Sequence, residues 1–115
     1  MNRFDTIVQG KHSLEYPIVA QALGQLFYLV NAGAAVTVFL LDAPNRDAYR
    51  FGRPYLTLAM SPTSMRHGGQ AMLPYGGQWF MVIRNENFHP VRVETELQFF
   101  PTNPTPTGGI FSGST

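Results

Sequence analysis

Apolar and polar positions alternate most clearly near the end of the chain. Between Pro90 and Phe100, Val, Thr, Leu and Phe fill every second position, and charged or amide side chains fill the positions between them. A period of two with β-branched and aromatic residues predicts a strand with one exposed face. Residues 78–84 (QWFMVIR) are apolar at nearly every position, which favours a strand buried on both faces. The polar link between these segments predicts that they pair as an antiparallel hairpin.

Short apolar segments separated by turn residues fill the rest of the chain. Residues 26–30 and 36–41 predict two short strands joined by a tight connection over residues 31–34. Residues 18–25 have modest helical character, which Gly24 and a β-branched pair weaken. Further strands are expected over residues 4–8, 13–16, 55–60 and 70–73.

Many short strands with Gly and Pro turns predict an all-β fold. We expect a mainly antiparallel β-sandwich with jelly-roll-like connections. One domain is expected over residues 1–100, followed by an extended tail rich in Pro, Thr and Gly over residues 101–115. The predicted core consists of Leu26, Tyr28, Val36, Val38, Leu40, Trp79, Met81, Ile83, Val91, Val93 and Leu97.

Charge is scarce and unevenly spread. The chain has 8 basic and 7 acidic residues, a net charge of +1, which disfavours a nucleic-acid partner. Residues 17–41 and 98–115 contain no charged side chain. Such stretches are expected to be covered, the first by the core of the sandwich and the second by another chain. Ile110 and Phe111, the apolar pair in the tail, are therefore candidate assembly contacts.

Other features restrict the location and the chemistry. The chain has no cysteine, which excludes disulfides, thiolate metal sites and a cysteine nucleophile. The first ten residues lack a signal-peptide pattern, and the longest apolar stretch is interrupted and too short for a membrane span. We expect synthesis in the cytoplasm and no membrane partner. The final location is left open, and the virion is one candidate.

Catalytic motifs are missing. No nucleophile elbow, dinucleotide-binding fingerprint or phosphate-binding loop occurs in the sequence. The three histidines, at positions 12, 67 and 89, have no ligand spacing and are expected in exposed loops. Glu94 and Glu96 share one strand face, which we interpret as a solvated face. We predict no enzymatic activity, no catalytic residue, no cofactor and no metal, and a hydrolase of an unfamiliar kind is the third class considered.

Two polar segments could bind a partner. Residues 42–55 (DAPNRDAYRFGRPY) combine arginines and aromatic side chains, a mixture typical of interfaces. The alternative is a self-contained loop in which the aspartates pair with the arginines and cap turns. Residues 65–69 (MRHGG) predict either an anion-binding loop or a flexible hairpin loop. The candidate ligand or partner surface consists of Asn45, Arg46, Tyr49, Arg50, Arg53, Tyr55 and Arg66.

Residues 36–101 carry a family pattern. A hydrophobic strand ends in Asp42, an Asn-x-x-x-Tyr-x-x-Gly segment follows at Asn45, and a Gly-x-Trp strand begins at Gly77. This pattern resembles a family of small bacterial β-sandwich domains of unknown function, some of which lie beside TIR domains in defence-type proteins. The resemblance implies a sandwich with a binding or accessory role, and it supplies no ligand and no catalytic residues.

These observations lead to one predicted function and one alternative. The prediction is a non-enzymatic protein-interaction or structural module within an assembly, such as a virion decoration or capsid-associated subunit. Its partner would be protein, either a homo-oligomer or a larger assembly. The alternative is a small-ligand-sensing or accessory module of a bacterial defence-type system, built on the candidate surface given above.

Overall fold

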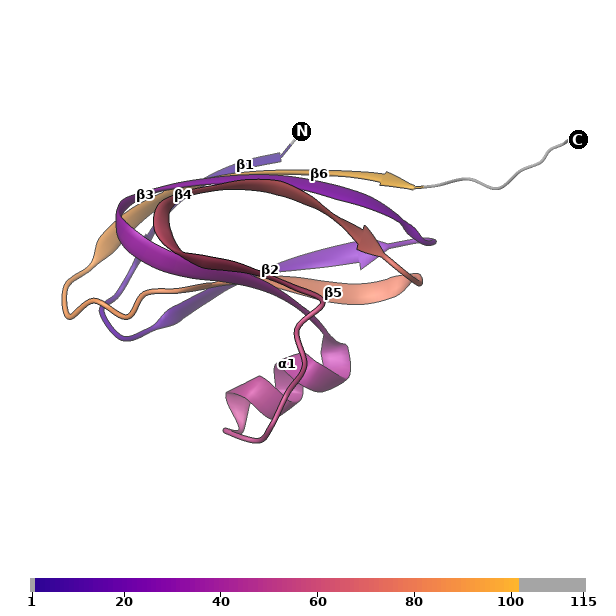
Figure 1. Cartoon of the computed structure of the whole chain (residues 1–115), viewed down its shortest axis with the longest axis horizontal. Coiled ribbons are helices and arrows are strands. Elements are labelled where there is room, and N and C mark those ends of the chain that lie inside the picture. Colours follow the sequence, from indigo (N-terminus) through magenta and orange to yellow (C-terminus); the bar gives the residue numbers. More distant parts are fainter. Residues whose placement is uncertain (1, 102–115) are drawn as a thin grey trace, which may run out of the picture.

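Strands form about two-thirds of the described chain. The computed structural model describes residues 2–101 (Figure 1). The elements are β1 (Asn2–Val8), β2 (Ser13–Ala20), β3 (Gly24–Asp42), α1 (Ala43–Arg50), β4 (Ala59–Leu73), β5 (Gly77–Arg84) and β6 (Val91–Pro101). The all-β, mainly antiparallel prediction is confirmed. The predicted tail, with Ile110 and Phe111, lies outside the described residues except for Pro101, which still belongs to β6.

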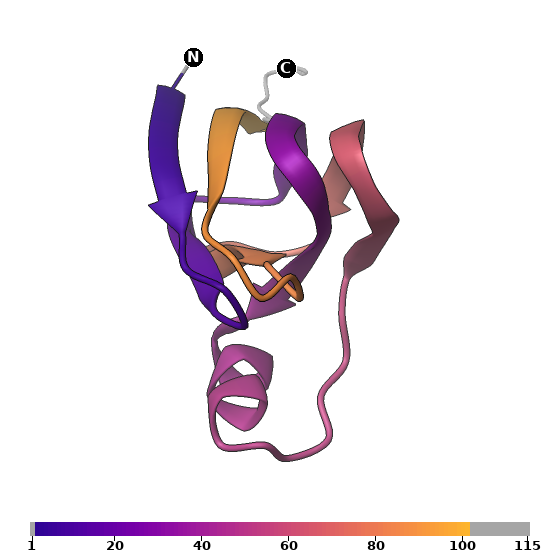
Figure 2. The same cartoon turned by 90° about the vertical axis from the view of Figure 1, so that its left-hand side faces the viewer.

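The 19-residue strand β3 organises the sheet. Its first part lies between β4 and β6, and its last part lies between β4 and β5. The strand order is β1-β6-β3-β5-β2, with β4 on the other side of β3. The sheet curls so that β1 and β6 face β2 and β5 across the core (Figures 1 and 2). We call these two halves the β1 layer and the β2 layer.

Small residues allow β3 to bend between the layers. Register shifts in its pairing with β4 lie between Asn31 and Val38, where the sequence is rich in Ala and Gly. Small side chains let a strand coil sharply without steric conflict, and a bulge increases the local twist. The prediction of two short strands joined by a turn is therefore wrong, because residues 31–34 continue the strand.

The two layers enclose the predicted core. Every residue of that predicted set is buried except Tyr28, which is partly buried and packs against the others. Phe4 of β1 and Tyr16 of β2 stack with their ring centroids 4.6 Å apart, so the layers touch through side chains as well. The alternation predicted for residues 90–100 is confirmed, because Val91, Val93 and Leu97 all point into this core.

The predicted hairpin between residues 78–84 and 90–100 is wrong. Strand β5 pairs with β2 and β3, whereas β6 pairs with β1 and β3. Both faces of β5 are buried, as its sequence predicted. Trp79, Met81 and Ile83 enter the main core, and Phe80 and Val82 form a second cluster on the opposite face.

A buried asparagine fixes the crossing between the layers. The Asn85 side-chain amide donates to the carbonyl oxygens of Val8 at 3.0 Å and His89 at 2.9 Å. It thereby satisfies backbone groups that the change of layer leaves unpaired. The link after β5 therefore carries the chain from one layer to the other. Its polar composition is equally typical of a hairpin loop, which is why the hairpin prediction was wrong.

Other local predictions also differ from the structure. Residues 18–25 are not helical, since β2 runs to Ala20 and β3 begins at Gly24. Residues 70–73 are the end of β4, which starts at Ala59 and includes only the last two residues of the expected 55–60 strand. Residues 65–69 are strand rather than loop. Among residues 2–101, no helix is long and apolar enough to cross a membrane.

Candidate interaction surface

The candidate site lies on the side of the β1 layer that faces away from the core, here called the outer face. Strand alternation sends Leu26 and Val30 of β3 inward, so Phe27 and Leu29 point outward. Leu29 pairs with Gly68 of β4 on one side. The sheet therefore presents apolar side chains where an exposed face would ordinarily be polar.

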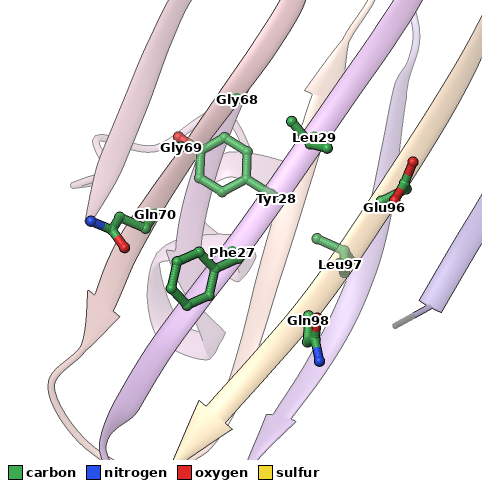
Figure 3. A pocket seen from close by; sticks show the side chains of 9 residues that line it. All are labelled: Phe27, Tyr28, Leu29, Gly68, Gly69, Gln70, Glu96, Leu97 and Gln98. Carbon is green, nitrogen blue, oxygen red and sulfur yellow. The ribbon is translucent and has the colours of Figure 1, made fainter.

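These side chains border a groove of about 460 Å³. Figure 3 shows it running along β3 between β4 and β6. Phe27 is 39% exposed and Leu29 is 49% exposed, so neither is sealed by the chain itself. The groove is lined by Phe27, Tyr28, Leu29, Gly68, Gly69, Gln70, Glu96, Leu97 and Gln98.

Two glycines of β4 line the groove. A Cβ at Gly68 would lie 3.0 Å from the Leu29 Cδ2 atom, and one at Gly69 would lie 3.1 Å from the Tyr28 hydroxyl oxygen. Both distances are tighter than ordinary carbon contacts. Gly68 shares the outer face with Leu29, so it lets that side chain lie close to the β4 backbone and leaves this side of the groove open. Gly69 does the same for Tyr28 on the core-facing side.

Apolar exposure continues toward one end of the sheet. Phe27 meets Phe100 edge to face with ring centroids 5.5 Å apart, and Phe100 is itself exposed. Met72 on β4 is also exposed. Contiguous apolar surface of this kind marks interaction sites more often than isolated exposed residues do.

Charged side chains at the other end pair with one another. Arg3 lies 3.7 Å from Glu96, and Arg92 bonds Asp5 and lies 3.8 Å from Glu94. The hydrogen bond from Arg92 is the main cause that lowers the pKa of Asp5 below its ordinary value. This end of the outer face is therefore a network of paired ions, next to an apolar end.

The segment 42–55 is a capped helix with its return loop. Asp42 caps α1, because its Oδ1 accepts from the Asn45 backbone N–H at 3.1 Å and from the Asn45 side chain at 2.7 Å. The Tyr75 hydroxyl donates to Asp42 Oδ2 at 2.5 Å. Partial burial opposes ionisation of Asp42, but the hydrogen bonds from Tyr75 and Asn45 outweigh it and lower the pKa of Asp42.

Side chains of α1 and the residues after it hold the helix on the β2 layer. The Asn45 side-chain oxygen accepts from the Leu56 backbone N–H at 2.9 Å. The Tyr49 hydroxyl lies 2.5 Å from the Ser13 hydroxyl, and the Tyr49 ring packs edge to face on Phe39 and Tyr55. These contacts close the second apolar cluster from outside.

Three arginines of this segment have internal partners. Arg46 stacks over the Phe80 ring at 4.1 Å and lies 3.5 Å from Glu15, which also pairs with Arg50 at 3.1 Å. Arg53 lies over the ring of Phe51 at 5.3 Å. The structure thus gathers six of the candidate surface residues around α1.

Arg66 does not join them. It lies on β4 opposite Asn31 of β3, at the charged end of the outer face beside Glu94. Next to it, His67 is buried, so the expectation of an exposed loop histidine is wrong at this position. Its Nε2 donates to the carbonyl oxygens of Val36 and Ser64, both at 2.9 Å, and its Nδ1 lies 2.6 Å from the Ser61 hydroxyl. His67 therefore braces the bend of the β3–β4 pair.

The outer-face groove is absent from the predicted candidate surface. Its signal was the run Leu26–Val30, which is apolar on both faces and belongs to the charge-free stretch 17–41. The sequence predicts that the sandwich core alone covers this stretch. The core covers Leu26 and Val30, but it leaves Phe27 and Leu29 exposed. Within the described part of the chain, no three His, Asp or Glu side chains gather as a metal site.

Comparison with known proteins supports the fold. A scan against models of protein families finds no match, and no curated protein matches the sequence. Among solved structures, the chain is similar to the Yersinia pseudotuberculosis-derived mitogen, with a TM-score of 0.58 and 13% sequence identity. The alignment covers 91% of this chain and 88% of the mitogen chain. At this identity the likeness extends to the β-fold and no further.

Proposed function

We propose that the chain is a non-enzymatic protein-interaction module that works within an assembly. The observation that carries this proposal is the apolar groove on the outer face, where Phe27 and Leu29 are exposed beside two glycines. A partly exposed apolar groove is stabilised when another protein removes it from water. The setting we propose is a structural assembly, such as a virion decoration layer or a capsid-associated subunit.

The small-ligand alternative has less support. It was built on polar side chains around α1, and Asn45, Tyr49 and Arg50 already bond other parts of the chain. A ligand that used them would have to replace these internal bonds, at a cost of about 1 kcal/mol for each. Binding at the outer face breaks no internal hydrogen bond, because its exposed apolar side chains contact only water there.

Cross-linking inside cells that produce the protein tests the proposal. The wild-type chain should appear in complexes heavier than its own 12.8 kDa. Leu29→Lys should remove them, since a charge at the groove opposes burial. The monomer should tolerate this lysine, because Glu96 of β6 lies opposite position 29.

Val19→Lys is the matched control. Val19 is an exposed apolar residue on β2, in the other layer, so this variant carries the same charge change away from the groove. Complexes should survive it. The proposal fails if the protein is found only at monomer mass, or if Leu29→Lys leaves the complexes unchanged.

A further inference from the structure

Among residues 2–101, three strands lie at free edges of the sheet. Strands β1, β2 and β4 each pair with a single neighbour, namely β6, β5 and β3. A free edge presents unpaired backbone N–H and C=O groups to which another strand can add. Natural proteins usually protect such edges with charges, prolines or short strand length.

Two of the three edges are protected in this way. Strand β1 has 7 residues and carries Arg3 and Asp5. Strand β2 has 8 residues and carries Glu15 and Pro17. A strand that added to either edge would have to accommodate these charges, or the proline, which has no backbone N–H to donate.

The third edge is protected only in its first half. Strand β4 has 15 residues, with Pro62 and Arg66 near its start and middle. Residues 67–73 (HGGQAML) carry no proline and no Asp, Glu, Lys or Arg. This unprotected half runs directly beside the outer-face groove, since Gly68, Gly69 and Gln70 line it (Figure 3).

The unprotected half is also complementary to itself. On the outer face, Gln70 lies midway between Gly68, which has no side chain, and Met72, whose side chain is exposed. An antiparallel pair of two such strands, related by a two-fold axis at Gln70, would place each Met72 opposite Gly68 of the other copy. Each Met72 would then reach toward Leu29 and the groove, and Arg66 would face Pro74 instead of another arginine.

We propose that the partner at this surface is a second copy of this chain, joined through antiparallel pairing of residues 67–73 of the two β4 strands. This inference rests on the proposed function and names its first partner. The pairing makes one sheet continuous across both copies and covers the β4 side of each groove. A two-fold interface uses the same patch twice, which is the commonest arrangement in homo-oligomers.

Single cysteines test this pairing directly, because the wild-type chain contains none. Residues directly opposite in an antiparallel pair have Cβ atoms about 4.5–5.5 Å apart, close enough for a disulfide after a small adjustment. The full chain with Gln70→Cys should form a covalent dimer under mild oxidation. Val19→Cys, an exposed position on the protected β2 edge, is the control and should stay mainly monomeric.

Sedimentation of the purified full chain provides the second measurement. Wild type should sediment as a dimer, and Met72→Lys should weaken dimerisation by about tenfold or more, since it moves a charge into the apolar groove. Ile7→Lys adds the same charge to an exposed residue of the β1 edge and should leave the dimer intact.

Several results would overturn the inference. One is a purified chain that stays monomeric while complexes in cells still depend on Leu29, because the proposed function would then stand with a different partner. Equal cross-linking of Gln70→Cys and Val19→Cys would indicate random collision. A monomer whose 67–73 amides are protected from hydrogen exchange, and lose protection when residues 102–115 are deleted, would assign the edge to the chain's own tail.

Discussion

The segment around α1 and the outer face of the β1 layer differ in whether their residue types indicate which side chains are free to bind a partner. The α1 segment has the arginines and tyrosines that are typical of interfaces, yet most of those side chains bond to β2, β5 or each other. The outer face has few polar groups near Phe27 and Leu29, and its apolar side chains contact water. Residue type alone therefore overstates the binding capacity of the first region and understates that of the second.

This contrast makes a general prediction about substitutions. Changes around α1 should lower the free energy of unfolding and leave association unchanged. Changes on the outer face should disrupt association and leave the free energy of unfolding nearly unchanged, because those side chains contribute little to the stability of the folded monomer.

The largest expected effect is on the cluster beneath α1. Phe39 is buried against Tyr49 and Tyr55, so Phe39→Ala should lower the free energy of unfolding by about 3–5 kcal/mol. Phe27→Ala removes a phenyl ring from the exposed face of the same strand and should cost clearly less. Urea unfolding followed by Trp79 fluorescence measures both. Equal losses for the two variants would contradict the contrast.

The helix cap should have a smaller effect, and one that depends on pH. Asp42→Ala removes the cap of α1 and should cost about 1 kcal/mol. Asp42→Asn keeps an acceptor for the Asn45 N–H but removes the charge. The pKa of Asp42 is lowered in the folded chain, so its contribution is complete above the ordinary value of 3.8 and is lost as pH falls through the lower folded pKa.

Unfolding experiments between neutral and acid pH separate these two roles. The stability of wild type should fall more steeply below about pH 4 than that of Asp42→Asn. Identical acid profiles for the two proteins would show that the charge of Asp42 adds nothing to its capping role. The exposed pair of Asp5 and Arg92 is present in both proteins, so the comparison is unaffected by it.

The ion pairs of Glu15 should contribute less again. Glu15→Gln removes the charge that faces Arg46 and Arg50, and Arg50 is more than half exposed. The expected loss is at most about 1 kcal/mol, and it should shrink as salt is added. Thermal unfolding at low and high ionic strength checks this, and a loss that is independent of salt would assign Glu15 a packing role instead.

The smallest change in stability is expected on the outer face. Leu29→Lys should alter the free energy of unfolding by no more than about 0.5 kcal/mol, because the side chain is already half exposed. The same variant should abolish the complexes described above. A large loss of stability would make Leu29 a structural residue and remove the difference between the two regions.

The sequence predicted which residues are buried better than it predicted which strands pair. The period of two in β6 and the doubly apolar pattern of β5 identified buried positions correctly, because burial depends on local alternation. The partner of β5 could not be found in this way, since a strand pairs according to which distant strands share its layer. The bend of β3 was missed for a related reason, because Ala and Gly at residues 32–35 are as compatible with a turn as with a coiled strand.

The candidate site was harder to predict than the core. Its arginines and tyrosines made the α1 segment a candidate binding surface. Whether these side chains are free to bind a partner depends on Glu15 and Ser13, which lie about thirty-five residues away in sequence. The groove depends on Gly68 meeting Leu29 across two strands, which no local pattern specifies. The one visible sign was the apolar character of both faces of residues 26–30.

The pairing of β1 with β6 also determines when the fold can close. Residues 2–8 of β1 pair with residues 91–97 of β6, so almost the whole described chain is synthesised between a strand and its partner. Until residues 91–97 have been synthesised, Phe4 and Val8 lack part of their final packing contacts, and β1 has no β6 with which to form hydrogen bonds. Contacts between such distant segments slow folding. The β1 layer is therefore completed only after nearly the whole described chain has been synthesised, and its apolar strands are exposed to other chains for that time.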